Sequence, residues 1–187
     1  MKIDRSTTRE QLAAIVVEKL QQHGIDAALV GGSVVSIYTA NKYASDDLNF
    51  ICSAAHDRIV SAMLELGFKR AAGGTSKDFK HADTHFTVEF PTGPLALGET
   101  VPVVPEGRIE VEGIAVKLLS PTQCVMDRLL WFFYCNDRQC LDQAVWVAQS
   151  HPISMEKLTA WAKREPNQES IQQKMQVFLS CINSQSP

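Results

Sequence analysis

The 187-residue sequence is long enough for one domain, or for one small domain with an appended helical one. Hydrophobic residues make up 45% and charged residues 21%, which is ordinary globular usage and excludes a chain that is disordered along its whole length. A net charge of −3 excludes an overall basic, nucleic-acid-binding composition, although this average still allows a local basic patch.

Three features of the sequence indicate a cytoplasmic protein that does not enter a membrane. No stretch approaches ~18 uninterrupted apolar residues, the length that a membrane-spanning helix needs. The amino-terminal segment MKIDRSTTREQ lacks the apolar core of a secretory signal. There is no CxxC pair, so we expect reduced thiols at all five cysteines, which are Cys52, Cys124, Cys135, Cys140 and Cys181.

The first third of the sequence predicts helices that alternate with strands. In chain order these are a helix that contains Leu12 to Leu20, a strand at 27–30, a helix at 33–40, a strand at 47–52 and a helix at 55–66. The strand at 47–52 alternates, which places Asp47 and Asn49 on one face and Leu48 and Phe50 on the other.

The middle of the sequence predicts further strands, and its last third predicts helices. The segment 71–78 (AAGGTSKD) reads as a loop, 85–90 as a strand, 91–107 as a Pro/Gly-rich connection, and 108–118 as a hairpin. From Ser120-Pro121 onward the pattern is helical, with a break near Asn136. We therefore predict an α+β fold, in which residues 1–119 form an α/β domain and residues 120–187 form a helical domain packed on it.

The segment 28–51 places phosphate-binding and metal-binding residue types close together in the sequence. A strand ends in Gly31, Gly32 and Ser33 at the start of a helix, where glycines allow close backbone approach, free N–H groups attract an oxyanion, and the serine hydroxyl adds a donor. The oxygens of Asp47 and Asn49 on one strand face can hold a divalent ion. Glu89, on the face of its strand that also carries His85 and Thr87, is the candidate third ligand.

The order of these pieces resembles the nucleotidyltransferase (DNA polymerase β-like) superfamily, whose pattern is hG[GS], a strand with [DE]h[DE], and a later acidic residue. The segment is most similar to small bacterial nucleotidyltransferases of abortive-infection and toxin–antitoxin systems. Besides the glycine turn and Asp47, the matching residues are Tyr38, Lys42 and Ser45. A weaker resemblance is to the helical extension of that group. It is found at Leu119 to Thr122, at Asp127 to Leu129, and at Asn136 to Arg138 with Asp142.

The resemblance implies a small mixed β-sheet flanked by helices, with a carboxy-terminal helical extension. It also implies binding of a nucleoside triphosphate with Mg²⁺ or Mn²⁺ and transfer of a nucleotidyl group to an RNA or protein acceptor, with an antitoxin protein as a further partner. Asp47 and Glu89 become the catalytic residues, and Glu89 can also accept the acceptor's proton. The nucleotide-binding residues become Gly31, Gly32, Ser33, Lys42 and Lys80, and the metal ligands become Asp47, Asn49 and Glu89.

One residue departs from the family pattern, because Asn49 stands where the second carboxylate is expected. An amide oxygen can ligate a cation but brings no charge, so the affinity for metal should fall by several kcal/mol. Such a site could still hold one Mg²⁺ that arrives with the nucleotide. Asn49 therefore keeps a second interpretation open, a binding module that has lost turnover. A third, a structural interaction protein, explains none of the order of the motifs.

Several charged residues have two interpretations. Lys77, Lys80 and His81 lie in or beside the loop before the Glu89 strand, where they could contact a triphosphate or only solvent. Arg128 with Asp127 forms either a structural ion pair between a helix and the sheet, which we favour, or a phosphate contact.

Overall fold

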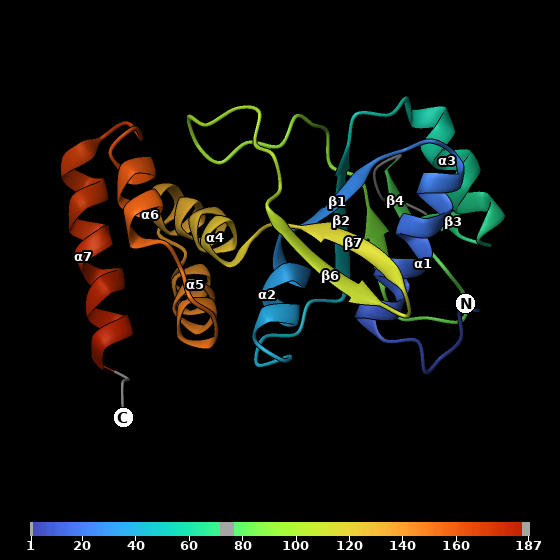
Figure 1. Cartoon of the computed structure of the whole chain (residues 1–187), viewed down its shortest axis with the longest axis horizontal. Coiled ribbons are helices and arrows are strands. Elements are labelled where there is room, and N and C mark those ends of the chain that lie inside the picture. Colours follow the sequence, from blue (N-terminus) through green and yellow to red (C-terminus); the bar gives the residue numbers. More distant parts are fainter. Residues whose placement is uncertain (1, 72–76, 185–187) are drawn as a thin grey trace.

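The computed structural model describes residues 2–71 and 77–184. Within these ranges the chain forms seven helices and seven strands (Figure 1). In chain order they are α1 (Arg9–Gln22), β1 (Ala27–Val30), α2 (Gly32–Tyr38), β2 (Asp47–Cys52), α3 (His56–Glu65), β3 (Lys69–Arg70), β4 (Asp78–Lys80), β5 (Thr87–Glu89), β6 (Gly107–Val111), β7 (Ile114–Leu118), α4 (Pro121–Cys135), α5 (Arg138–Ser150), α6 (Met155–Ala162) and α7 (Gln168–Ser184).

The strands form one mixed sheet in the order β3-β4-β5-β2-β1-β7-β6. The pairs β2/β5 and β1/β7 are parallel, and the other neighbours are antiparallel. The parallel pairs are joined by long connections, whereas β6 and β7 form the predicted hairpin, which turns at Glu112-Gly113. The predicted α+β fold class is confirmed.

The alternation of the strands separates an apolar face from a polar face. Leu48, Phe50, Val88 and Phe79 are fully buried, and in Figure 1 α1 and α3 pack on one side of the strands. The side chains between these residues in sequence point the other way and are exposed or half-buried. We call this second side the polar face of the sheet; it is defined by Asp47, Asn49 and Glu89.

Two helices begin at the caps that the sequence indicates. Thr8 caps α1 and Ser120 caps α4, each in a capping box completed by the glutamine three residues later. The break near Asn136 is confirmed, since Asn136 adopts the left-handed conformation at the end of α4. These capping boxes mark the first residues of α1 and α4.

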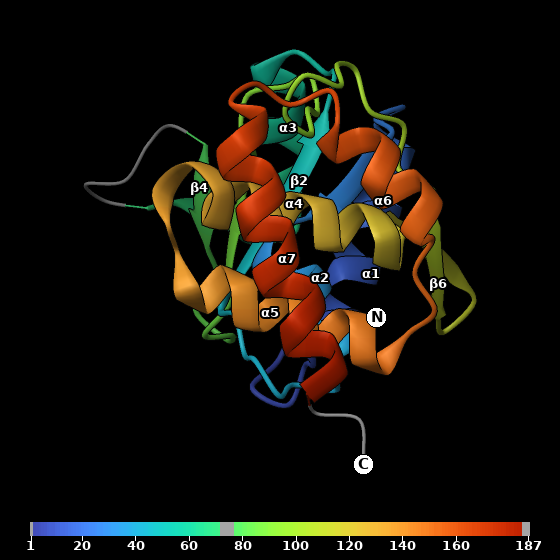
Figure 2. The same ribbon diagram turned by 90° about the vertical axis from the view of Figure 1, so that its left-hand side faces the viewer.

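The helices α4 to α7 lie together beside the sheet, and α7 is the outermost of them (Figures 1 and 2). The change from strands to helices falls between Leu118 and Pro121, and α2 joins the two parts. The Tyr38 hydroxyl donates to the Leu119 carbonyl at 2.7 Å, and the His151 ring nitrogen lies 2.9 Å from the Tyr38 carbonyl. The division into two domains stays a prediction. No helix in the described ranges is both long and apolar enough to cross a membrane.

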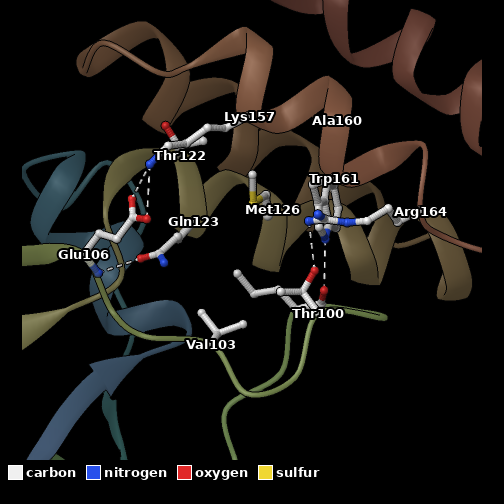
Figure 3. A pocket seen from close by; sticks show the side chains of 11 residues that line it. Thr100, Val103, Glu106, Thr122, Gln123, Met126, Lys157, Ala160, Trp161 and Arg164 are labelled. Carbon is white, nitrogen blue, oxygen red and sulfur yellow. Dashed lines mark hydrogen bonds and ion pairs between the residues drawn. The ribbon is translucent and has the colours of Figure 1, made fainter.

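The helical part also holds the connector, which we define as residues 91–106 between β5 and β6. The Trp161 indole N–H donates to the Leu97 carbonyl at 2.9 Å, and the buried Glu165 carboxylate accepts the Glu99 N–H at 2.9 Å and the Tyr134 hydroxyl at 2.7 Å. A cavity of about 250 Å³ remains between the connector, α4 and α6, and an ion pair of Lys157 with Glu106 lies beside it (Figure 3).

Three predicted elements differ from the structure. The helix predicted at 33–40 ends at Tyr38, because Ala40 and Asn41 have positive φ angles. The strand predicted at 85–90 is shorter in the structure, where β5 spans Thr87–Glu89. The segment predicted as a loop at 71–78 is flanked by strands β3 and β4, and Asp78 belongs to β4; residues 72–76 lie outside the described residues.

Candidate functional site

A glycine turn connects β1 to α2 and lies against β2. Gly31 has a φ of 72°, which side chains other than glycine rarely adopt, and a Cβ atom there would lie 3.5 Å from the Asn49 amide nitrogen. A Cβ atom on Gly32 would lie 3.1 Å from the Ser45 hydroxyl oxygen. Gly31 therefore supplies the backbone conformation of the turn, and Gly32 allows the turn to pack closely against Ser45, which leads into β2.

The register of three neighbouring strands brings the predicted site residues together. Asn49 lies opposite Val30 of β1 on one side and Glu89 of β5 on the other. Asp47 lies opposite Thr87, two residues away from Asn49 on the same face. Gly31, Asp47, Asn49 and Glu89 thus converge on the polar face, as the sequence predicts.

The donors on the polar face suit a single hard cation. Two carboxylates and one amide supply oxygen atoms, and Mg²⁺ usually binds through one or two carboxylates together with waters and substrate phosphates. Among the described residues no group of three or more His, Cys, Asp or Glu side chains is placed to hold a metal ion. Asp47 and Glu89 are the two carboxylates of the predicted ligand set, and Asn49 is its amide, so the metal site stays a prediction.

The surroundings of Glu89 favour its protonated form. Burial raises the pKa of Glu89, and the negative charges of Asp47 and Asp78 raise it further. Asp78 lies opposite Glu89 on β4, so the polar face carries a row Asn49–Glu89–Asp78 across three strands. Asp78 was not predicted as a site residue because 71–78 was expected to be a loop, and the three residues of β4 are too few to show the alternation of a strand.

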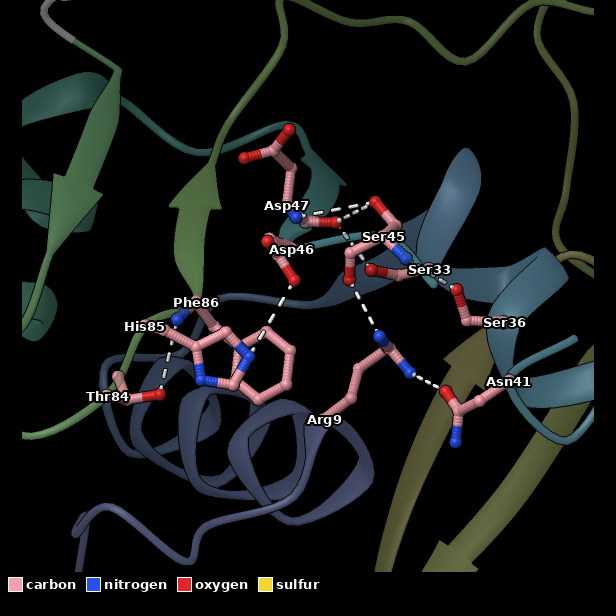
Figure 4. A network of polar contacts seen from close by, with 10 residues as sticks. All are labelled: Arg9, Ser33, Ser36, Asn41, Ser45, Asp46, Asp47, Thr84, His85 and Phe86. Carbon is pink, nitrogen blue, oxygen red and sulfur yellow. Dashed lines mark hydrogen bonds and ion pairs between the residues drawn. The ribbon is translucent and has the colours of Figure 1, made fainter. Parts of the chain in front are cut away.

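A hydrogen-bond network fixes the start of β2 (Figure 4). Ser33 is fully buried, and its hydroxyl donates to the Asp47 carbonyl. The Ser45 N–H donates to the Ser36 hydroxyl at 3.0 Å. Ser33 was predicted to offer its hydroxyl to a phosphate; in the structure this hydroxyl positions Asp47, so a contribution of Ser33 to phosphate binding would come from its backbone N–H.

Arg9 supports the same network from the first turn of α1, and it was not singled out in the sequence. Its Nε and Nη2 atoms donate to the Ser45 carbonyl at 3.1 and 2.8 Å, and Nη1 donates to the Asn41 side chain. The guanidinium also lies 5.3 Å from the centroid of the Phe86 ring, just before β5. Arg9 is only 6% exposed, and burial lowers its pKa. A cation in the first helical turn opposes the helix dipole, which is the signal that could have identified Arg9.

We expect Arg9→Met to destabilise the fold by roughly 2 kcal/mol, because it leaves the Ser45 carbonyl and the Asn41 side chain without their charged donor. Urea unfolding measures the loss. Arg5→Met is the matched control, since Arg5 is exposed in the preceding turn and should change the unfolding free energy little. Equal midpoints for the two variants would contradict the supporting role of Arg9.

The predicted basic residues lie in different places. The Lys42 ammonium lies 4.9 Å from the centroid of the Trp146 ring on α5. Lys80 belongs to β4 and shares the polar face, but two strands separate it from β1 and the glycine turn. His81 packs against Phe68.

Arg128 and Asp127 form the predicted structural ion pair. Their atoms are 2.6 Å apart, and both side chains are largely buried. Arg128 also donates to Gln143 on α5 at 3.3 Å. The pair therefore lies within α4 and stabilises the packing of α4 on α5, whereas the structural interpretation expected a pair between a helix and the sheet.

Comparison with known proteins relates the fold to nucleotidyltransferases. No protein-family model matches the sequence, and no curated protein matches it significantly. Among solved structures, an antigenic nucleotidyltransferase-like protein from Paracoccidioides brasiliensis is similar with a TM-score of 0.63 and 12% identity, over 97% of this chain and 92% of that one. ANT(2″)-Ia in complex with adenylyl-2″-tobramycin is similar with a TM-score of 0.52 and 13% identity, over 93% and 98%. The chain therefore has a nucleotidyltransferase-like fold.

Proposed function

We propose that this protein binds a nucleoside triphosphate with one divalent metal ion and transfers its nucleotidyl group to an acceptor hydroxyl. The observation that carries the proposal is the strand register that places Asn49 beside Glu89, with Asp47 on the same face and the glycine turn against Asn49. ANT(2″)-Ia, which has a similar fold, was solved with an adenylylated molecule, and this supports the same class of reaction.

Each part of the site has a role in this reaction. Backbone N–H groups at Gly31 and Gly32 would hold the phosphates, and oxygens of Asp47, Asn49 and Glu89 would hold Mg²⁺ or Mn²⁺. The bound ion supplies positive charge beside the phosphates. Glu89 accepts the proton of the acceptor hydroxyl, whose oxygen bonds to the α-phosphorus while the bond to pyrophosphate breaks.

A transfer assay tests the proposal. The purified chain is incubated with each α-labelled nucleoside triphosphate, with Mg²⁺ or Mn²⁺, and with separate pools of RNA and protein. We expect label in one pool that depends on the metal. Absence of transfer with all four nucleotides and both metals would contradict an active enzyme.

Asn49 favours a second function, a nucleotide-binding module that has lost turnover. An amide in place of a carboxylate weakens metal binding. In that case the chain still binds nucleotide, but the transfer assay shows no labelled acceptor. Lys42 and Lys80 remain predicted nucleotide contacts under both functions; the Lys42 ammonium lies against the Trp146 ring, and two strands separate Lys80 from β1.

We expect Asn49→Asp to tighten Mn²⁺ binding in the presence of nucleotide by at least about tenfold, because it restores one unit charge next to the ion. Calorimetry measures the change. Ser53→Asp is the control for added charge, since Ser53 is exposed just after β2. If Asn49→Asp leaves the metal affinity unchanged, residue 49 does not contribute to a metal site.

We also propose, from the resemblance of residues 28–51, that the protein is the cytoplasmic toxin of a toxin–antitoxin pair. Expression of the chain should then arrest growth, and the arrest should need Asp47. Relief of the arrest by a small protein from an adjacent reading frame would identify the antitoxin. Equal growth arrest by the Asp47→Ala chain would contradict this assignment.

A further inference from the structure

The cavity between the connector, α4 and α6 has mainly apolar walls (Figure 3). Leu97 and Val103 contribute to it from the connector, Met126 from α4 and Trp161 from α6. Replacement of water beside such side chains by an apolar group is favourable. At about 250 Å³ the cavity is slightly smaller than the pockets of roughly 300–1,000 Å³ that hold drug-sized ligands. It therefore suits the apolar body of a small molecule.

Most polar groups around this cavity are already used by the protein. The Gln123 side chain accepts the Glu106 N–H at 2.9 Å and donates to the Val104 carbonyl at 2.8 Å. The Trp161 indole N–H is bound to the connector, and the Lys157 ammonium lies 2.9 Å from the Glu106 carboxylate. These groups hold the walls together, so they are not the ones that would bind the polar end of a ligand.

The Arg164 guanidinium differs from these groups. Figure 3 shows it with Thr100 at the end of the cavity opposite to Lys157 and Glu106. Its Nη2 atom donates to the Thr100 hydroxyl at 3.1 Å, but among the described residues it forms no ion pair. A guanidinium presents its donors in a planar fork that matches both oxygens of a carboxylate. The cavity therefore offers unused donors and an uncompensated positive charge at one end.

The distribution of charge around the cavity favours a ligand with a single negative charge. At the opposite end, the charge of Lys157 is compensated by Glu106, whose carboxylate would repel a second anionic group. A phosphate group carries nearly two negative charges and three strong acceptor oxygens, which is more than one guanidinium compensates. A carboxylate carries one charge and two oxygens, and it matches Arg164 alone.

We infer that this cavity binds a small monocarboxylic acid, with its carboxylate on Arg164 and its apolar chain or ring against Met126 and Trp161. The site lies between the connector and two helices, apart from the glycine turn and the proposed metal ligands on the sheet. The acid is thus a second ligand, distinct from the substrates of the proposed transfer reaction. Because it contacts three segments that pack together only in the folded chain, its binding stabilises the fold.

Calorimetric titration of the full chain, without nucleotide or metal, tests the inference. The probes are hexanoate and phenylacetate, and each is compared with its neutral amide, hexanamide or phenylacetamide. Acetate is a further control, because it has the carboxylate without the apolar body. We expect the two acids to bind, each amide to bind at least about tenfold more weakly than its acid, and acetate to bind at least about tenfold more weakly than hexanoate.

Two variants locate the bound acid. Arg164→Gln should weaken the binding of both acids at least about tenfold and leave the binding of the amides unchanged, because it removes only the charge. Ala160→Phe should weaken the binding of all probes, since Ala160 lines the cavity and is exposed on α6, where a larger side chain is tolerated. The matched control is Lys163→Gln, which removes the neighbouring exposed charge outside the cavity and should change no affinity.

Three outcomes would overturn the inference. They are the absence of a binding heat for both acids up to ~10 mM, equal affinities of the acids and their amides, and equal losses for Arg164→Gln and Lys163→Gln. The last result would show a general effect of surface charge. The titrations involve no nucleotide, so the proposed transfer reaction can fail its own test while the cavity binds the acid, and the reverse also holds.

Discussion

Replacement of Asp47 by alanine is expected to reduce nucleotidyl transfer by on the order of 10³-fold, the loss typical when one preorganised electrostatic group is removed from a site. Asp47 is exposed on the polar face and supplies one of only two carboxylates among the three proposed metal ligands. Because Asn49 brings no charge, the loss of Asp47 leaves Glu89 as the single anionic ligand. The measurement is the initial rate of label transfer at saturating Mn²⁺.

The neighbouring residue provides a matched control for this change. The Asp46 carboxylate is also exposed, but it lies 3.7 Å from the His85 ring nitrogen and points away from the Asp47 carboxylate (Figure 4). Asp46→Ala should therefore keep most of the transfer rate and all of the fold. Equal losses in the two variants would show that charge near β2, rather than ligation by Asp47, determines the rate.

Glu89→Gln is expected to lose activity and gain stability at neutral pH. The loss should be roughly 10² to 10⁴-fold, because the amide cannot accept the acceptor's proton. The gain follows from the raised pKa of Glu89, whose ionisation is less favourable in the folded chain than in the unfolded one. The stability that Glu89 contributes is present below its unfolded pKa and is lost as the pH rises through its higher folded pKa. Urea unfolding at pH 4 and pH 7 should show the difference between variant and wild type only at the higher pH.

The pH profile of kcat/KM separates the two roles of Glu89. Activity should rise with pH as Glu89 ionises. This rising limb of the pH profile should lie above the ordinary pKa range of glutamate, because burial and the charges of Asp47 and Asp78 raise the pKa of Glu89. Asp78→Asn removes one of the negative charges and should move the limb to lower pH while the fold is retained. An unmoved limb would mean that a group other than Glu89 accepts the proton.

Much of the fold and of the proposed site was predictable because the determining interactions are local. The capping boxes of α1 and α4 and the alternation of Asp47 to Cys52 fix these elements within a few residues. The convergence of Gly31, Asn49 and Glu89 followed from the faces of two strands and their order. This convergence requires β2 and β5 to be neighbours, and in the sheet they are parallel partners.

The parts that could not be predicted depend on contacts between distant residues. Strands β3 and β4 have two and three residues, too few to show a period; β4 pairs with β5, and β3 pairs with β4. The place of Asp78 beside Glu89 was hidden for this reason. The inward turn of the Ser33 hydroxyl depends on the Asp47 carbonyl, and the role of Arg9 depends on Ser45, 36 residues away along the chain.

The attachment of the connector to the carboxy-terminal helices has a consequence for the cooperativity of unfolding. The connector begins two residues after Glu89, and its hydrogen bonds run to Trp161 and Glu165 near the end of α6. Removal of the helices after residue 119 would leave the Leu97 carbonyl and the Glu99 N–H without these partners and would release the segment on the carboxy-terminal side of Glu89. Glu89, the proposed proton acceptor, is thus held by strand pairing on one side and by the carboxy-terminal helices on the other, and the protein should unfold in one step rather than lose its helices first.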